Sequence, residues 1–414
     1  MELKPGYKQT EVGVIPEDWD VRPLSNISLR IMVGIASAAT HAYRLSGIPM
    51  IRNQNIKPGH LLDSDLLFID QEYEKTYRNK RLLEGDLLTT RTGYPGTTCI
   101  VPAKYKAAQS FTTLITRPDI AQITSEFLCL FINSEHGQRF FESSQIGGAQ
   151  KNVNTGTLKK MPIPIPTVSE QTKVSNVLGA VEELLASIEN LIAKKRAVKQ
   201  AAMQELLTGK RRLPGFEGEW ETVALSQVSE KITGFWGRTE SGNEAIHSTN
   251  VIRAGDISEE GRLIGAARRF LSHHEISVAG CRPGDTVMTA SGNGLGKSWT
   301  CNQDGVYSAS NFVRIIRPQR GKADGHFIGY ALKSRCARSK LVEHTATSAY
   351  PNLKPSFFND RWLSLPPQPE QKAISEVLQD VDIEIDELEA RKLKASQLKQ
   401  GMMQQLLTGK IRLQ

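Results

Sequence analysis

One stretch of this sequence has residue types and a spacing that could bind phosphate. Residues 291–298 read Ser-Gly-Asn-Gly-Leu-Gly-Lys-Ser and end in the Gly-Lys-Ser of a P-loop. The first glycine of that motif would fall on Ser291, and the corresponding turn at residues 92–97 has no lysine. A nucleotide-binding enzyme that uses this loop is therefore the less favoured alternative. The pattern favours a glycine turn that brings backbone N–H groups and Lys297 near a nucleic-acid phosphate.

Other patterns of catalytic residues are missing from the sequence. An adenine methyltransferase needs an Asn/Asp-Pro-Pro-Tyr/Phe loop, but the adjacent prolines Pro366 and Pro367 are followed by Gln368. We find no Asp…Glu-x-Lys nuclease pattern, and His273-His274 has no Cys, His or Asp partner at the spacing of metal ligands. We therefore expect no catalytic residue, no metal site and no cofactor bound by this chain.

Composition and charge limit the class of protein. The 414 residues are 39% hydrophobic and 23% charged, as in soluble chains of two or three domains. No apolar run is long enough to span a bilayer, and the polar residues 1–10 do not form a signal peptide. The net charge of +8 permits a nucleic-acid partner without establishing one. The cysteines are odd in number and widely spaced, which predicts reduced thiols and a cytoplasmic location: Cys99, Cys129, Cys281, Cys301 and Cys336.

The sequence contains an internal repeat. Residues 203–213 have the pattern Met-Gln-x-Leu-Leu-Thr-Gly-Lys-x-Arg-Leu, and residues 403–413 repeat it at an offset of 200. Without any gap, Glu170-Gln171 also corresponds to Glu370-Gln371. The earlier parts of each repeat match more loosely, with offsets between 199 and 201: Trp19 with Trp220, Gly85-Asp86 with Gly284-Asp285, Arg117-Pro118 with Arg317-Pro318, and Asn152 with Asn352. We interpret this as a shared frame that carries two diverged central regions.

The conserved end of each repeat predicts a long helix. Residues 169–208 and 369–408 have apolar residues at alternating spacings of three and four, the pattern of a coiled coil. Thr167-x-x-Glu170 has the spacing of a capping box, and Gly209 and Gly409 suit C-terminal caps. A helix of this length is roughly 60 Å long. The predicted seam consists of Leu178, Val181, Leu185, Ile188, Ile192, Leu378, Val381, Ile385 and Leu388.

Neither helix could bury this seam alone. Antiparallel pairing about a pseudo-two-fold axis is the simplest solution, and packing of each helix on its own preceding domain is the alternative. Val177, Leu184 and Leu191 are also apolar, so the first helix could offer a further face to another protein.

The remainder of each repeat predicts a mixed α/β domain, with short β-type runs separated by Gly, Pro and Asn turns. Strands are expected at residues 86–90 and 312–316, and short helices near residues 126–134 and 326–334. The predicted fold is α+β, with two α/β domains joined by two long antiparallel coiled-coil helices in a pseudo-two-fold tandem repeat. The four expected segments are a first domain at 1–168, a central helix at 169–210, a second domain at 211–368 and a C-terminal helix at 369–414.

Arginine, asparagine and aromatic residues in predicted loops are the candidate DNA contacts, because their side chains suit base edges and phosphates. In the first repeat they are Tyr43, Arg44, Arg52, Asn53, Arg91, Thr92, Tyr94, Lys151, Asn152 and Asn154. In the second repeat they are Trp236, Arg238, Ser291, Asn293, Lys297, Tyr350 and Asn352. For each of these residues, an ordinary solvated loop position is the alternative, and Asn152 and Asn352 could simply hold turns.

Taken together, these motifs resemble the DNA-specificity subunit of type I restriction–modification systems. The most specific are Gly-Val-Ile-Pro-Glu-Asp-Trp at residues 13–19, the Gly-Asp-x-x-x-Thr strand with its following glycine turn, and Pro-x-Pro…Glu-Gln before each helix. The doubled Met-Gln-x-Leu-Leu-Thr-Gly-Lys ending adds to the resemblance. The first repeat departs from the family pattern at its Arg-Thr-Gly-Tyr-Pro-Gly turn, residues 91–96.

The resemblance implies two target-recognition domains, each of which reads one half of a bipartite, asymmetric DNA site. It implies that the paired helices act as a spacer and as a docking platform for two methyltransferase subunits and for restriction (translocase) subunits. S-adenosylmethionine, ATP and Mg²⁺ would then bind to those partners, and this chain would be non-catalytic. The remaining alternative is a coiled-coil adaptor that binds DNA without sequence preference, which predicts weak affinity at every sequence.

Overall fold

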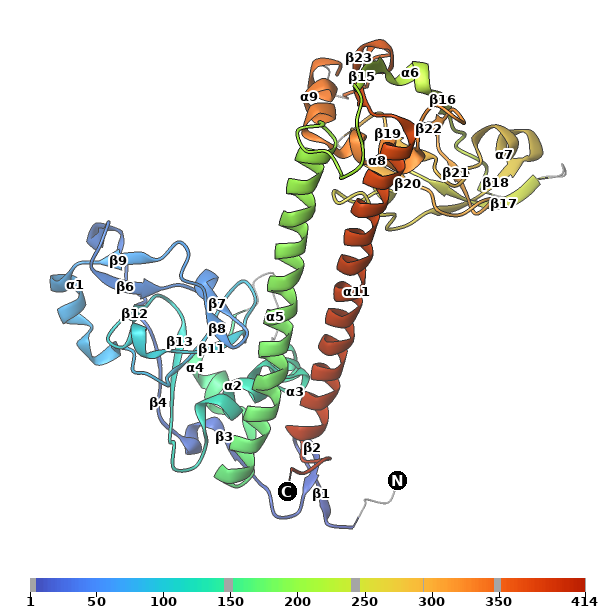
Figure 1. Ribbon diagram of the computed structural model, residues 1–414. Helices are drawn as coiled ribbons and strands as arrows, with labels where there is room; N and C mark the ends of the chain where they lie inside the picture. The colour runs from blue at the N-terminus through green and yellow to red at the C-terminus, as the bar shows by residue number, and fades with distance from the viewer. Residues whose placement is uncertain (1–4, 145–151, 240–245, 293, 346–350, 414) are drawn as a thin grey trace. The chain divides into compact units, whose positions relative to one another are not determined.

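A computed structural model of the chain describes residues 5–144, 152–239, 246–292, 294–345 and 351–413. Contacts divide the chain into two compact units: residues 1–189 with 391–414, and residues 190–390. The long helices α5 (Val168–Leu206) and α11 (Gln368–Leu406) each contribute a segment to both units (Figure 1). Their bounds lie within two residues of the predicted ones, so the prediction of two long helices is confirmed.

The first unit is built on a four-stranded antiparallel sheet with the strand order β11-β10-β13-β4. Neighbouring residues of one strand face opposite sides of a sheet. Accordingly, Leu87 packs into one hydrophobic cluster and Leu88 into another, so both faces of the sheet are covered. The strands are β4 (Ser28–Val33), β10 (Leu87–Thr89), β11 (Thr98–Ile100) and β13 (Leu114–Pro118).

Helices cover one face of this sheet, and a smaller sheet accompanies it. Helix α2 begins after Thr124, whose Oγ1 accepts a hydrogen bond from the N–H of Phe127. The helices are α1 (Gln71–Thr76), α2 (Ser125–Asn133), α3 (Glu135–Ser143) and α4 (Thr155–Lys159). The smaller sheet has the order β12-β6-β9-β5, with strands β5 (Tyr43–Arg44), β6 (Ile48–Ile51), β9 (Leu67–Ile69) and β12 (Gln109–Ser110). The remaining pairs are β1 (Tyr7–Thr10) with β2 (Gly13–Pro16), β3 (Asp20–Pro23) with β14 (Pro162–Ile165), and β7 (Ile56–Lys57) with β8 (His60–Leu61).

The second unit repeats this topology. Its main sheet has the order β16-β22-β19-β20 and its smaller sheet the order β18-β17-β21, while β15 pairs with β23. The strands are β15 (Glu221–Ala224), β16 (Ser229–Thr233), β17 (Ile246–Ile252), β18 (Ala267–Ser272), β19 (Thr286–Thr289), β20 (Ser298–Thr300), β21 (Tyr307–Ala309), β22 (Val313–Pro318) and β23 (Arg361–Leu365). The helices are α6 (Leu225–Val228), α7 (His273–Ala279), α8 (Gly325–Lys333), α9 (Arg335–Glu343) and α10 (Ser356–Asn359). The predicted tandem repeat of mixed α/β domains is confirmed.

Ion pairs join α5 to α11 in antiparallel order within each unit. In the first unit Glu189 pairs with Lys392 at 2.6 Å, and Glu182 pairs with Lys399. In the second unit Lys199 pairs with Asp382 at 2.5 Å. The number of the α11 residue falls as that of the α5 residue rises, which confirms the predicted antiparallel pairing. The predicted seam is buried at Leu178, Ile188, Ile192, Leu378 and Ile385 and partly buried at Val181, Leu185, Val381 and Leu388.

The ends of the helices also belong to the cores of the two units. Leu178, in the third turn of α5, packs with Phe127 in the first core, and Leu378 packs with Phe327 in the second. Packing of each helix on its own preceding domain is therefore real for the first turns, but it does not replace helix pairing. The end of each helix packs against the domain of the other repeat. Leu406 and Leu407 lie in the first core, and Leu206 and Leu207 lie in the second.

A buried ion pair explains one of the repeated sequence patterns. In the first unit Arg117 Nη2 donates to Asp86 Oδ2 at 2.8 Å, and in the second Arg317 Nη2 donates to Asp285 Oδ2 at 2.7 Å. Both aspartates are 1% exposed, so each needs a charged partner. This interaction joins the turn before β10 or β19 to the neighbouring strand β13 or β22. It holds the loops that follow these strands at the same edge in both units.

Candidate nucleic-acid interface

Several candidate residues of the first unit gather at one edge of its sheets. Arg52 and Asn53 follow β6, and Arg91 and Thr92 follow β10. The Asn53 side-chain amide donates to Thr92 Oγ1 at 3.1 Å, which joins the two loops. The N–H of Val153 donates to the carbonyl of Arg91 at 3.0 Å, which brings the segment around residues 152–154 to the same place. We call residues 52–53, 91–94 and 152–154 the first loop cluster.

This cluster has hydrogen-bonding capacity that the described part of the chain does not use. Arg52 Nε, Asn53 Oδ1 and Arg91 Nε are buried atoms without a partner among the described residues. Such groups cost free energy unless water or a ligand satisfies them. Tyr94 is 88% exposed at the tip of the turn. Asn154 has a structural role, because its Oδ1 accepts from the N–H of Thr157 and caps α4.

The corresponding residues of the second unit form a second loop cluster with different chemistry. Ser291 pairs with Asn352 in an isolated β-bridge, and the N–H of Leu353 donates to the carbonyl of Ala290 at 3.0 Å. By these backbone contacts Ala290 corresponds to Arg91. Arg253 corresponds to Arg52, but its guanidinium pairs with Asp256 at 2.9 Å within the same turn. We call residues 253–254, 290–292 and 351–353 the second loop cluster.

The glycine turn at residues 291–298 is closed by its own backbone. The N–H groups of Leu295, Gly296 and Lys297 donate to carbonyls of Gly292, Thr289 and Gly294. The N–H of Gly292 donates to the carbonyl of Pro351. These amide groups are therefore not directed at a common phosphate, as they would be in a P-loop. The backbone of this turn therefore does not explain the expected approach to a phosphate. The Lys297 side chain pairs with Glu259 at 2.8 Å.

Four candidates lie on or beside the smaller sheets rather than in the loop clusters. Tyr43 and Arg44 form β5, where Arg44 pairs with Asp70 at 2.6 Å. Arg238 lies at the corresponding edge of the second unit, in a bridge with Phe270. Trp236 is 45% exposed, and it packs edge-on against Phe312 with the guanidinium of Arg269 5.8 Å from its ring centre. Three further candidates, Lys151, Asn293 and Tyr350, lie outside the described residues.

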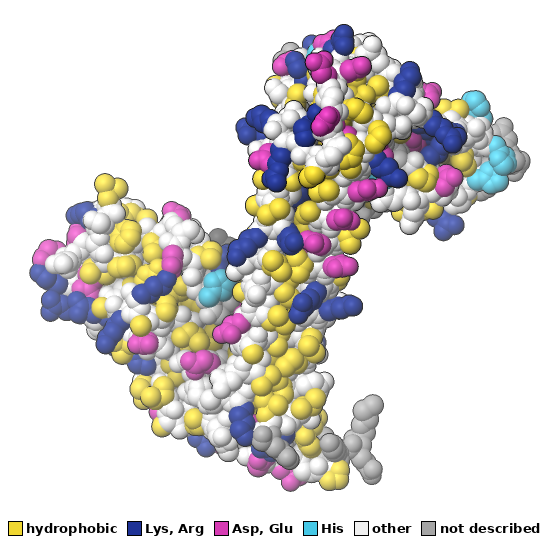
Figure 2. Space-filling view, in the orientation of Figure 1, with side chains coloured by type: hydrophobic (Ala, Val, Ile, Leu, Met, Phe, Trp, Pro, Cys, Tyr) yellow, Lys and Arg dark blue, Asp and Glu magenta, His cyan; other side chains and the backbone are white. Residues whose placement is uncertain are grey.

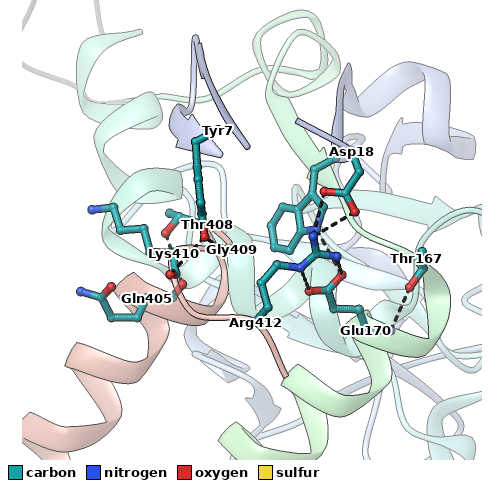
Figure 3. Close-up of polar contacts among 10 residues, drawn as sticks. Tyr7, Asp18, Thr167, Glu170, Gln405, Thr408, Gly409, Lys410 and Arg412 are labelled. Atoms are coloured by element: carbon teal, nitrogen blue, oxygen red, sulfur yellow. Dashed lines mark hydrogen bonds and ion pairs between the residues drawn. The ribbon is translucent and has the colours of Figure 1, made fainter. Parts of the chain in front are cut away.

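A cluster that the sequence analysis missed holds the frame of the first unit together. Trp19 Nε1 donates to Glu170 Oε2 at 3.1 Å, and Arg412 Nη2 donates to the same oxygen at 2.8 Å. Arg412 also pairs with Asp18 at 2.8 Å (Figure 3). Tyr7 adds a hydrogen bond from its hydroxyl to the carbonyl of Gly409 at 3.1 Å. The tail after α11 is thus fixed to the first domain and to the start of α5.

The second unit contains the same cluster. Trp220 Nε1 donates to Glu370 Oε2 at 3.1 Å, and Arg212 Nη2 donates to that oxygen at 2.7 Å. In both Trp–Glu–Arg clusters, the arginine comes from the tail of the other repeat. The hydrogen bond with Glu170 raises the pKa of Arg412 above its usual value, so this cation is permanent. The sequence signal was present, because all three residue types recur at offsets of 200 or 201.

Glu170 also corrects the predicted capping box. Thr167 Oγ1 accepts from the N–H of Glu170 at 3.2 Å, as the pattern predicts. The Glu170 carboxylate, however, turns to Trp19 and Arg412 rather than back to Thr167. A buried carboxylate with two strong donors gains more from them than from one backbone amide, because charge-assisted bonds are the stronger ones.

The described residues show little that resembles a catalytic centre. Among them, no group of three or more His, Cys, Asp or Glu side chains could hold a metal ion. The five cysteines are free thiols, and burial raises the pKa of Cys129 to about 12, which keeps it protonated and unreactive. In the same part of the chain, no helix is long and apolar enough to cross a membrane.

Comparison with known proteins places both units in one family. The model of the type I restriction modification DNA specificity domain matches residues 16–196 and again residues 217–397. A putative type I restriction enzyme MjaX specificity subunit of Methanocaldococcus jannaschii is 22% identical, over 98% of this chain and 96% of its own length. The type I restriction enzyme EcoKI specificity subunit of Escherichia coli K12 is 21% identical over 87% of this chain and 82% of its own. The crystal structure of a type I restriction-modification system S subunit from M. genitalium has a similar fold, with a TM-score of 0.61 over 98% of both chains at 13% identity.

Proposed function

Because this chain belongs to the type I restriction–modification DNA specificity family, we propose that each of its units reads one half of a bipartite, asymmetric DNA sequence. The observation that carries the proposal is the contrast between frame and loops. Both units keep the Trp–Glu–Arg cluster and the buried Arg–Asp pair, while the first loop cluster presents Arg91 where the second has Ala290. A shared frame supports both loop clusters in the same way, and different loop residues give unlike half-sites.

We propose that the first loop cluster supplies the base contacts of the first unit. Arg91 is the best candidate, because its Nε has no partner among the described residues and a guanidinium can bond two acceptors of a guanine. Arg52 is more constrained, since it donates to the Asp65 carbonyl at 2.6 Å. In the second unit Trp236 and Arg238 are the stronger candidates, because the amides of the glycine turn are used internally.

The outer faces of the long helices suit partner subunits. Leu184, Leu191 and Val198 are spaced by seven residues, which places them on one face of α5, and they are 42%, 42% and 58% exposed. On α11, Leu393 and Leu398 are 61% and 60% exposed. Figure 2 shows hydrophobic side chains exposed along the helices. Exposed apolar side chains of this extent are typical of protein interaction surfaces. Val177, which was expected to contribute, packs instead against the first core.

The proposed partners are two methyltransferase subunits and restriction (translocase) subunits, as the family resemblance implies. S-adenosylmethionine, ATP and Mg²⁺ would bind to those subunits. This chain would contribute DNA recognition without catalysis, and the assembly would work in the cytoplasm. The distance between the two half-sites would be a fixed property of the assembly.

The experiment is to map methylated adenines across the host genome with and without this gene. We expect a bipartite motif with a fixed gap to disappear when the gene is deleted. Replacing residues 211–368 by the same region of a relative should then change one half of the motif and leave the other half and the gap unchanged.

Two outcomes would overturn the proposal. One is an assembly that modifies the same sequence after this exchange. The other is a purified chain that binds all duplexes equally at physiological salt, which would favour the non-specific adaptor.

A further inference from the structure

A cavity of about 580 Å³ lies within the second unit, between the turn at residues 259–261, the start of β20 and helices α8 and α9. Its size is within the range of about 300–1,000 Å³ that small-molecule sites occupy. Leu295, Leu332, Leu341 and Val342 form its apolar wall. Its charged lining residues are Lys297, Lys333, Arg338 and Glu259.

Polar side chains around this cavity have unused hydrogen-bond donors. Ser298 is 1% exposed, and its Oγ has no partner among the described residues. Lys333 Nζ makes one long bond of 3.4 Å to the carbonyl of Gly261. Lys297 pairs with Glu259, but the Glu259 side chain is 75% exposed, so water weakens that pair.

A glycine makes room for the Lys333 side chain. Gly261 has a φ of +77°, and a Cβ at this position would stand 2.5 Å from Lys333 Cε and 2.6 Å from the carbonyl oxygen of Ser298. Burial lowers the pKa of Lys333 to about 8, so its ammonium group still carries charge at neutral pH. The lysine is therefore held charged beside the cavity by one long bond to a backbone carbonyl and by the ring of Tyr330, whose centre lies 5.8 Å from Nζ.

The first unit provides an internal comparison, because the same positions hold neutral, satisfied side chains. Asn133 stands where the second unit has Lys333, and its Nδ2 donates to the carbonyl of Thr98 at 2.8 Å. Gln138 stands in place of Arg338, and its Nε2 donates to the carbonyl of Ile132 at 2.8 Å. Phe141 replaces Leu341, is 1% exposed and packs directly on Gly96.

From this contrast we propose that the cavity binds a small phosphorylated organic molecule of about the size of a mononucleotide. Arg338, Lys297 and Lys333 would surround the phosphoryl group, and the leucine wall would take the ring or chain attached to it. Three cations against one carboxylate match the double charge of a phosphate monoester, and the Ser298 hydroxyl adds a neutral donor. Side chains form this site, so it differs from a P-loop. The inference stands independently of the proposed DNA recognition.

The phosphoryl group could belong to a free nucleotide or to the backbone of bound DNA, and one experiment distinguishes them. Calorimetric titration of the full chain with AMP, adenosine and inorganic phosphate measures the site directly. We expect one AMP per chain, with adenosine bound at least tenfold more weakly. Arg338→Gln should weaken AMP binding at least tenfold, and Leu341→Phe, which introduces the bulk found in the first unit, should abolish it.

Lys340→Gln is the matched control, because Lys340 lies on the same helix and pairs with Glu343 outside the cavity. It should leave AMP binding within a factor of two. Unchanged thermal unfolding of each variant without ligand shows that the fold is retained. If AMP and a DNA duplex bind together, the site serves a free nucleotide, as proposed; if a duplex displaces AMP, the cavity belongs to the DNA interface and the proposal is overturned. Absence of AMP binding, or binding that Arg338→Gln and Leu341→Phe leave unchanged, would overturn it, whatever sequence preference the same samples show for DNA.

Discussion

The first and second units contain the same buried polar contacts at corresponding positions. Glu170 and Glu370 each accept from a tryptophan and from an arginine, and Asp86 and Asp285 each pair with an arginine. In the loops this correspondence ends, because Arg91 has Ala290 as its counterpart. The buried contacts therefore specify where the loops stand, while the loop side chains can differ without changing the fold.

The turn that contains Gly59 in the first unit and the turn that contains Arg262 in the second show a second difference. In the first unit the N–H of Gly59 donates to the carbonyl of Thr98 at 2.9 Å, so its turn lies along the main sheet. In the second unit Arg262 pairs with Asp386 at 2.5 Å and also with Glu389, both on α11. Ion pairs thus attach the second domain to its helix pair through a loop that the first unit uses differently.

The largest effect is expected from breaking the shared frame. Arg412→Ala should destabilise the first unit by about 3–5 kcal/mol, because it leaves the buried Glu170 carboxylate without its cation. Arg212→Ala should cost the second unit at least as much, since the Glu370 side chain is 0% exposed against 6% for Glu170. Hydrogen–deuterium exchange should rise in β3 and β14 for the first variant and in β15 and β23 for the second.

The exposed Arg211, whose nearest carboxylate oxygen is 3.7 Å away on Glu205, provides the control. Arg211→Ala should change the free energy of unfolding by less than about 1 kcal/mol. Equal loss of stability in this control would show that the buried clusters have no special role.

The next effect concerns recognition by the loops. Arg91→Ala should cost about 1–3 kcal/mol in binding to the cognate duplex and relax the preference in one half-site only. Competition titrations against duplexes altered in either half measure this. Arg139→Ala, which removes an exposed pair with Glu135, should leave both half-sites unchanged. An equal loss at both half-sites would mean that Arg91 contacts only phosphate.

A smaller effect is expected from the ion pairs of Arg262, which have no counterpart among the described residues of the first unit. Arg262→Ala should lower the free energy of unfolding of the second unit by about 1 kcal/mol, because Arg262 and its partners are partly exposed to water. The loss should shrink in high salt, which screens these charges. Chemical denaturation at low and high salt provides the test, and a loss that does not depend on salt would assign the effect to packing.

The smallest effect is a rise in stability with pH. Burial and the nearby Lys199 lower the pKa of Lys333 to about 8, whereas Asp382 opposes this change. Between this value and the usual pKa of a lysine, the unfolded chain holds a proton that the folded chain has released, so stability increases as pH rises through 8. From pH 7 to 8.5 the gain should be about 0.8 kcal/mol. Chemical denaturation of the second unit should show it, and Lys333→Met should remove it.

Much of the architecture was predictable because its signals are local or periodic. The apolar spacing of α5 and α11, the short helices expected near residues 126–134 and 326–334 and the short apolar runs of β10 and β22 each depend on neighbours in the chain. The offset of 200 residues also showed that the two halves share a frame. The candidate site was harder to predict from the sequence. Only part of the candidate DNA-contact residues meet in the loop clusters, and Lys297 pairs with Glu259 instead.

By itself, therefore, the sequence determined the repeat, the long helices, the type of each domain and the family. Only the tertiary structure decided which segments meet. The recurrence of Arg212 and Arg412 shows that the two tails are alike, but it does not reveal that each tail docks on the other repeat's domain. Arg412 and Glu170 lie 242 positions apart, so no local pattern links them, and the packing of the whole unit selects that partner.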